Sequence, residues 1–126
     1  MEIITNSNKE KNLRHHSIKG LIKVPELIDY LKELQNAPEF DPGMKVLWDL
    51  RKADLSLVST PDVSSIMESV VKQWGKTERN KAALVVSGDL DYGLSRMFQI
   101  MLEGETRSKV SVFKDMNKAE EWLETV

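Results

Sequence analysis

Short apolar segments alternate with longer amphipathic segments along most of this 126-residue chain. Residues 45–50, 82–86 and 110–113 are mostly apolar, which is typical of strands buried on both faces of a sheet. The stretches between them carry apolar residues three and four positions apart, the spacing of one helix face. Strands joined through helices must be mostly parallel, with helices covering the sheet. The sequence therefore predicts an α/β fold.

Two weaker strand candidates come before this alternation, over residues 3–5 and 13–18. Residues 6–8 between them, Asn-Ser-Asn, favour a turn, so we expect an N-terminal hairpin at one edge of the sheet. The predicted order is ββαβαβαβα, which gives a mostly parallel sheet of four to five strands covered by four helices. The chain has the usual size of one domain, and we expect residues 1–126 to fold as one.

Local signals predict where two of the helices begin and end. For the helix after the strand at 45–50, Thr60 is a candidate N-cap, Pro61 suits the first position and Gly75 suits the stop. For the last helix, Asn117 together with Glu120 resembles a capping box.

Composition excludes several classes of protein. The net charge is −2 and basic residues form no stripe, so we do not expect a nucleic-acid partner. The chain has no cysteine, which excludes disulfides, thiolate metal sites and a cysteine nucleophile. Its start is polar and no apolar run approaches the ~20 residues that span a bilayer. We expect a cytoplasmic protein with no integral membrane segment.

Ligands and partners of parallel α/β sheets usually sit outside the carboxyl ends of the strands. Here these ends lead into residues 49–60, 87–96 and 114–117. Candidate binding residues in the first two segments are polar, charged or aromatic: Asp49, Arg51, Ser56, Ser59, Thr60, Ser87, Asp89, Tyr92 and Arg96.

Three stretches of the chain resemble a known family. They are VLWDLR at 46–51 with Ala53, Asp54 and Leu55 after it, YGLSRMF at 92–98, and VFKDMNKAEEWL at 112–123. Together they resemble the small SpoIIAA-like proteins, which are related to the STAS domains of anti-sigma-factor antagonists and are grouped with the CRAL-TRIO lipid-binding fold. The resemblance implies the fold predicted above and no assigned biochemical activity.

STAS regulators carry a phosphorylatable Ser or Thr where the helix after the third strand begins. The resemblance makes Ser56, Ser59 and Thr60 the positional candidates for such a switch. The family pattern is Asp-Ser-Gly or Asp-Ser-Ser, whereas this chain has a longer segment without the adjacent Gly.

Catalytic arrangements are incomplete in this sequence. Asp49, Ser87 and Lys114 imitate the strand-end residues of a phosphoreceiver domain, but residues 3–8 lack the acidic pair that would hold its metal. The sequence favours instead a local charge pair of Asp49 with Arg51 that shapes the loop. Gly88 and Gly93 have the spacing of a nucleotide P-loop, but the lysine of that motif is absent after Gly93. The two glycines could instead end the strand and allow close helix packing, or bind an anion through backbone amides alone.

The two histidines are neighbours, His15 and His16, and on a strand they point to opposite faces. They cannot both ligate one metal, and we expect them to be surface or hairpin residues. No catalytic residue, metal site or cofactor is therefore predicted.

The third predicted helix offers two further possibilities. Arg96 could converge with Tyr92 and Asp89 on an anionic ligand, or could lie on a solvated face. Apolar residues of this helix could form core or line a pocket for an apolar ligand: Leu90, Leu94, Met97, Phe98 and Met101 give the helix its stripe, and the last four are the pocket candidates.

The sequence thus favours a non-enzymatic binding or regulatory module that docks a protein partner or a small apolar or anionic ligand at the strand ends. One alternative is a carrier of a small apolar or lipid-like ligand. A lower alternative is an enzyme of the Asp-dependent phosphotransfer or hydrolase type. Either a monomer or a homodimer is compatible with the sequence.

Overall fold

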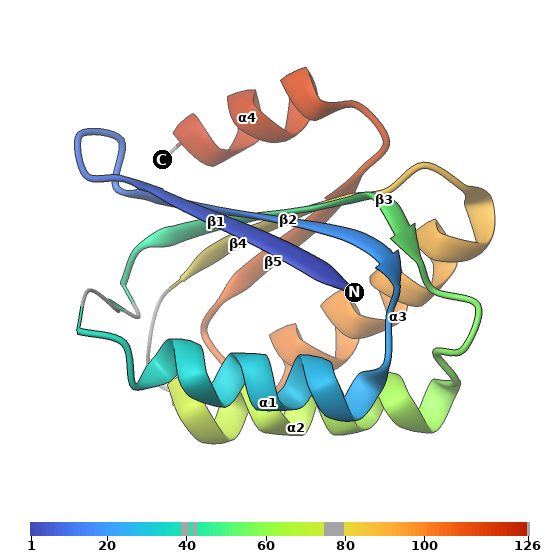
Figure 1. The fold of residues 1–126 in the computed structure, drawn as a ribbon. Coiled ribbons are helices and arrows are strands. Elements are labelled where there is room, and N and C mark those ends of the chain that lie inside the picture. Colours follow the sequence, from blue (N-terminus) through green and yellow to red (C-terminus); the bar gives the residue numbers. More distant parts are fainter. Residues whose placement is uncertain (39–40, 42, 75–79, 126) are drawn as a thin grey trace.

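A computed structural model describes residues 1–38, 41, 43–74 and 80–125 of the chain. Its centre is a five-stranded sheet in the order β1-β2-β3-β4-β5, in which β1 is antiparallel to β2 and every other neighbouring pair is parallel (Figure 1). The strands are β1 Glu2–Asn8, β2 Leu13–Leu21, β3 Lys45–Asp54, β4 Lys81–Val85 and β5 Lys109–Phe113.

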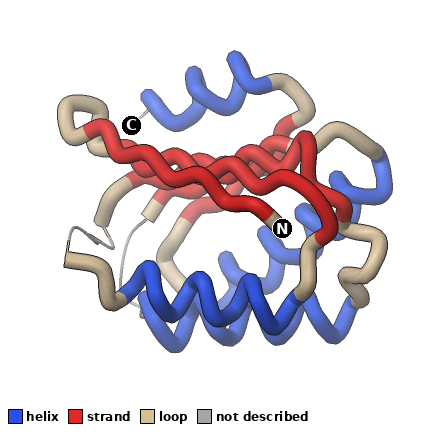
Figure 2. Tube along the Cα trace, in the orientation of Figure 1, coloured by secondary structure: helices blue, strands red, loops and turns tan. Residues whose placement is uncertain are grey.

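In the described residues, four helices cover the sheet, three on one face and one on the other (Figures 1 and 2). The first three lie side by side below the sheet in Figure 1, and α4 lies alone above it. They are α1 Val24–Gln35, α2 Thr60–Trp74, α3 Asp89–Glu105 and α4 Met116–Glu124. The predicted ββαβαβαβα order and mostly parallel sheet are confirmed.

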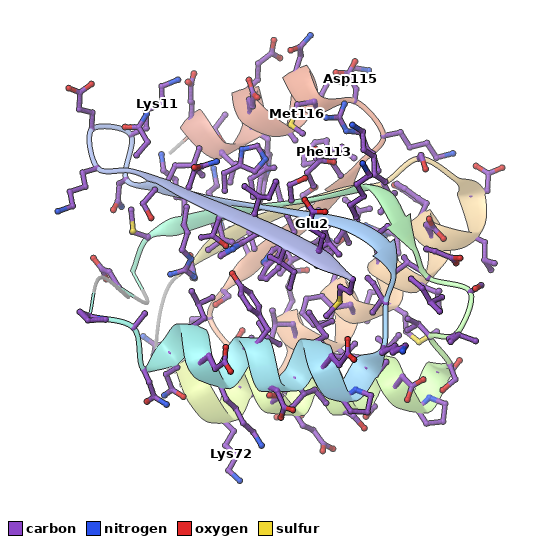
Figure 3. All side chains as sticks on the ribbon, viewed as in Figure 1. Glu2, Lys11, Lys72, Phe113, Asp115 and Met116 are labelled. Carbon is purple, nitrogen blue, oxygen red and sulfur yellow. The ribbon has the colours of Figure 1, made fainter. Side chains whose placement is uncertain are left out.

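Alternate residues of the central strands supply the two cores, because successive side chains of a strand point to opposite faces. Val46, Leu84 and Val112 belong to the larger cluster, which lies between the sheet and helices α1, α2 and α3. Leu47 and Val85 belong to the smaller cluster, which packs against Ala119 and Leu123 of α4. Figure 3 labels Phe113 and Met116, which pack against this smaller cluster.

The N-terminal hairpin differs from its prediction in where it turns. Both strands are longer than expected, and residues 6, 7 and 8 pair with His15, Arg14 and Leu13 in that order instead of forming the turn. The turn lies over residues 9–12, where Asn12 takes a positive φ of 51°. Asparagine tolerates this left-handed conformation better than most residues, which favours the turn there.

The predicted caps of α2 and α4 are each displaced toward the N-terminus. Ser59, not Thr60, caps α2, because its Oγ accepts from the Asp62 amide at 3.3 Å while the Asp62 carboxylate accepts from the Ser59 amide at 2.9 Å. Asp115, not Asn117, caps α4 by accepting from two amides of the first turn. Gly75, the predicted stop of α2, lies outside the described residues.

Ser59→Ala should therefore lower the free energy of unfolding by about 1 kcal/mol, because it leaves an amide of the first turn of α2 without its acceptor. Thr60→Ala is the matched control and should change this free energy by less than half as much, since no hydrogen bond of the Thr60 side chain is among those found in the described residues. Urea unfolding followed by circular dichroism measures both. Equal effects would contradict the assignment of the cap.

Candidate functional site

An ion pair marks the point where β3 passes the end of β4. The Arg51 guanidinium donates to both carboxylate oxygens of Asp49, at 2.9 Å each, and the Arg51 amide donates to the same carboxylate at 3.1 Å. The pairing of β2 with β3 shifts register here, since Ser17 pairs with Asp49 but Lys19 pairs with Lys52. An extra residue in β3 thus forms a bulge, a feature that commonly redirects side chains.

A second ion pair joins the start of α3 to the end of β5. The Lys114 ammonium contacts the Asp89 carboxylate and lies 5.5 Å from the centre of the Tyr92 ring. Between the two ion pairs, the Ser87 hydroxyl donates to the Arg51 carbonyl at 3.3 Å. The structure therefore connects Asp49, Arg51 and Ser87 in one group and Asp89 and Tyr92 in another.

Most charged groups at these strand ends are already matched. The hydrogen bond from Arg51 lowers the pKa of Asp49, and the hydrogen bond from Lys114 lowers the pKa of Asp89. Asp91 differs, because partial burial and the nearby Asp54 charge raise its pKa. Arg51 and Lys114 are thus both engaged by carboxylates, which argues against an open anion site at these two side chains.

The three hydroxyl candidates lie in the loop from β3 to α2 and at the first residue of α2. Ser59 is used as the helix cap described above. Ser56 is exposed, and its amide donates to the Asp54 carboxylate at 2.9 Å. Hydrogen bonding from the Ser56 side chain, and then from this amide, lowers the pKa of Asp54. Thr60 is also exposed. The side chains of Ser56 and Thr60 thus face solvent on either side of the cap.

Two large apolar side chains project from this end of the molecule. Leu57 in the β3–α2 loop is 61% exposed, and Leu90 in the first turn of α3 is 74% exposed. The sequence stripe placed Leu90 in the core, which is wrong, because position 90 faces away from the buried side of α3. Leu57 was not singled out, because the loop sequence LSLVS at 55–59 also contains the buried Leu55 and the half-buried Val58 and gives no sign that Leu57 is the exposed one.

The expected convergence of Arg96 with Tyr92 and Asp89 is not found. Arg96 is exposed and donates to the side chain of Gln99, one turn along the same helix, at 3.0 Å. It therefore lies on the outer face of α3, whereas Tyr92 contacts Lys114 at the strand ends.

An apolar cavity of about 120 Å³ lies between the sheet and helices α1, α2 and α3. Leu94 and Phe98 line it as predicted for an apolar pocket, together with Trp48 from β3 and Leu55 and Val58 from the loop after it. Met101 packs against the surrounding core, and Met97 and Met101 do not belong to the cavity lining.

A buried polar cluster beside this cavity was not predicted. His16, expected near the surface, is fully buried, and its Nε2 accepts from the Arg14 Nε at 2.9 Å. Because arginine can only donate, neutral His16 must carry its proton on Nδ1, which lies 2.9 Å from the Thr5 hydroxyl and 3.2 Å from the Tyr30 hydroxyl. The His16 ring stacks on Trp48 with centroids 4.2 Å apart.

Arrangements for metal chemistry or membrane insertion do not appear in the part of the chain that the structure describes. No three acidic, histidine or cysteine side chains there are grouped to hold a metal ion. Lys114 is paired with Asp89, so the described residues do not reproduce the Asp49, Ser87 and Lys114 group of a phosphoreceiver. None of the described helices combines the length and the apolarity that a bilayer crossing needs.

Comparison with solved structures identifies the fold. The chain is similar to an uncharacterised protein of the DUF3478 family from Shewanella loihica PV-4, which has a SpoIIAA-like fold. The match has a TM-score of 0.61 at 20% sequence identity and covers 97% of this chain and 92% of that protein. This chain therefore has a SpoIIAA-like fold, as its sequence predicted. No protein-family model and no curated protein matches it.

Proposed function

We propose that this domain is a binding module that docks a protein partner at the carboxyl ends of its strands. The observation that carries the proposal is the exposure of Leu57 and Leu90 on two segments of this end. These two leucines, together with the Asp49–Arg51 pair and the Asp89–Lys114 pair, form a surface that we call the strand-end face.

The composition of this face suits a protein better than a small anion. Large apolar side chains that a partner buries supply most of the binding free energy of a typical interface, and a charged rim fixes orientation and association rate. Leu57 and Leu90 would serve as the anchors. Arg51 and Lys114, already held by carboxylates, would form the rim.

Photo-crosslinking in the native host tests this proposal. A benzophenone amino acid at position 57 should form a covalent adduct of one defined mass, because a partner would cover this position. The same substitution at Ile4, which is 54% exposed on β1, is the matched control and should give no such adduct. Identical adducts at both positions, or none at position 57, would contradict docking at this face.

The apolar cavity supports a second candidate function, the binding of a small apolar molecule. Its volume of about 120 Å³ approaches the ~150 Å³ of an engineered cavity that holds benzene, and is well below the ~300–1,000 Å³ of common ligand pockets. A benzene-sized molecule fits these dimensions, whereas a long acyl chain would require the helices to separate. Partner docking therefore takes precedence.

A further inference from the structure

Helix α3 carries a second apolar stripe that its own core does not use. The buried side of this helix includes Ser95 and Leu102, with Leu94 and Phe98 partly buried beside them. Leu90, Met97 and Ile100 follow a different line along the helix, together with two glycines. Ile100 is 63% exposed, so this second line faces away from the domain.

The second stripe has the spacing of a helix-pairing seam. It runs through positions 90, 93, 97, 100 and 104, which are separated alternately by three and four residues, as in a heptad repeat. A β-carbon at Gly93 or Gly104 would meet no atom within 4 Å, so open space lies over both glycines. We call these five residues the α3 seam: Leu90, Gly93, Met97, Ile100 and Gly104.

We infer that the α3 seam pairs with the α3 seam of a second copy of this chain, in an antiparallel homodimer. A two-fold axis between Met97 and Ile100 would bring Met97 of each copy against Ile100 of the other. It would also bring Gly93 against Gly104, because both lie equally far from the axis. The long Met97 side chain leans toward the N-terminus of its helix and can fill the space over the glycines.

Charges beside the seam support pairing with a second copy rather than with an unrelated helix. Arg96 and Glu103 flank the seam on the same side, seven residues apart. In the antiparallel pair, Arg96 of each copy lies near Glu103 of the other, which gives two symmetric ion pairs at the rim. The contact from Arg96 to Gln99 keeps the guanidinium on this outer face.

The size of this interface sets its expected strength. α3 has 17 residues and is about 25 Å long, so a single pair of such helices buries less surface than a standard protein interface. The homodimer should therefore be weak and depend on concentration. This inference does not rest on the proposed partner. The strand-end face and the seam share Leu90, but Leu57 belongs only to the strand-end face and Ile100 only to the seam.

Sedimentation equilibrium of the full chain tests the homodimer. The wild type should show a monomer–dimer equilibrium, and Ile100→Asp should raise the dimer dissociation constant at least about tenfold by placing a charge in the seam. Ile4→Asp, on an exposed apolar residue of β1, is the matched control and should leave the constant unchanged. A monomer at all concentrations, or a dimer broken only by Ile4→Asp, would overturn the inference.

Charge reversal gives a second readout that folding defects cannot imitate. Arg96→Glu alone and Glu103→Arg alone should each weaken the homodimer, because like charges then face each other. A mixture of the two variants should form a heterodimer, since both Glu–Arg pairs are restored across the interface. Circular dichroism checks that each variant is folded, because Glu103 also accepts from the Val110 amide at 3.0 Å. No gain on mixing would contradict the antiparallel register.

Discussion

Trp48→Ala should lower the free energy of unfolding by about 3–5 kcal/mol, the usual range for removing a buried aromatic side chain. Trp48 is 9% exposed, stacks on His16 and already borders the apolar cavity. Removing its ring would join new empty space to an existing void, which the rigid strand beneath cannot collapse to fill. Urea unfolding followed by circular dichroism measures the loss.

Trp122→Ala is the comparison that isolates this effect. Trp122 lies on α4, is only partly buried, and contacts Phe113 and the Lys81 ammonium on the other face of the sheet. We expect it to cost clearly less than Trp48→Ala, because it borders no such cavity among the described residues. A cost equal to or larger than that of Trp48→Ala would contradict the view that packing around the cavity dominates stability.

The stability of the protein should fall as the pH is lowered from about 6.5 toward 3. Burial, reinforced by the Arg14 charge and then by His15, lowers the pKa of His16 from 6.5 to about 3. The unfolded chain therefore binds more protons than the folded chain in this window. Each pH unit below about 6 should remove up to about 1.4 kcal/mol of unfolding free energy. The contribution of neutral His16 to the free energy of unfolding is fully present above pH 6.5.

His16→Gln provides the control for the pH dependence. Glutamine can still accept from Arg14 but does not titrate, so the slope of unfolding free energy between pH 5 and 6.5 should flatten. Urea titrations of both proteins at several pH values give the two slopes. The same slope in the variant would show that other groups cause the acid sensitivity.

The fold could be predicted because local and global signals agree. The apolar strands at 45–50, 82–86 and 110–113 and the stripes between them leave few arrangements other than a parallel sheet covered by helices. The weak point was the hairpin, where polar residues 6–8 resemble a turn but pair with β2. Pairing at an exposed sheet edge depends on its neighbour more than on local preference, so the sequence alone could not place it.

The site was less predictable, because its important features depend on tertiary neighbours. The alternation of side chains along a strand correctly predicted that His15 and His16 point to opposite faces of the sheet. Nothing in the local sequence indicated that the His16 ring would be buried and hydrogen-bonded by Arg14, Thr5 and Tyr30. Leu90 has the sequence spacing of a core residue, but it is exposed because the packing of α3 on the sheet turns position 90 toward solvent.

The two proposed surfaces would serve different functions, partner docking at the strand-end face and dimerisation at the α3 seam. The strand-end face presents apolar anchors between ion pairs, and the α3 seam presents a self-complementary helix. Leu90 begins the seam and also belongs to the strand-end face, so a partner at that face would lie next to one end of the dimer interface. Binding and dimerisation could then be measured independently at Leu57 and Ile100.

Native mass spectrometry of the protein purified from its own host tests the central claim most directly. The wild type and the Ile4→Asp control should carry a second polypeptide of one defined mass. Leu57→Asp should lose this polypeptide, because a charge would replace the leucine that the partner buries. Samples measured before and after organic extraction separate a protein partner from an apolar ligand. A wild type that carries only a small adduct removed by extraction, or a polypeptide that all three proteins retain equally, would contradict partner docking at the strand-end face.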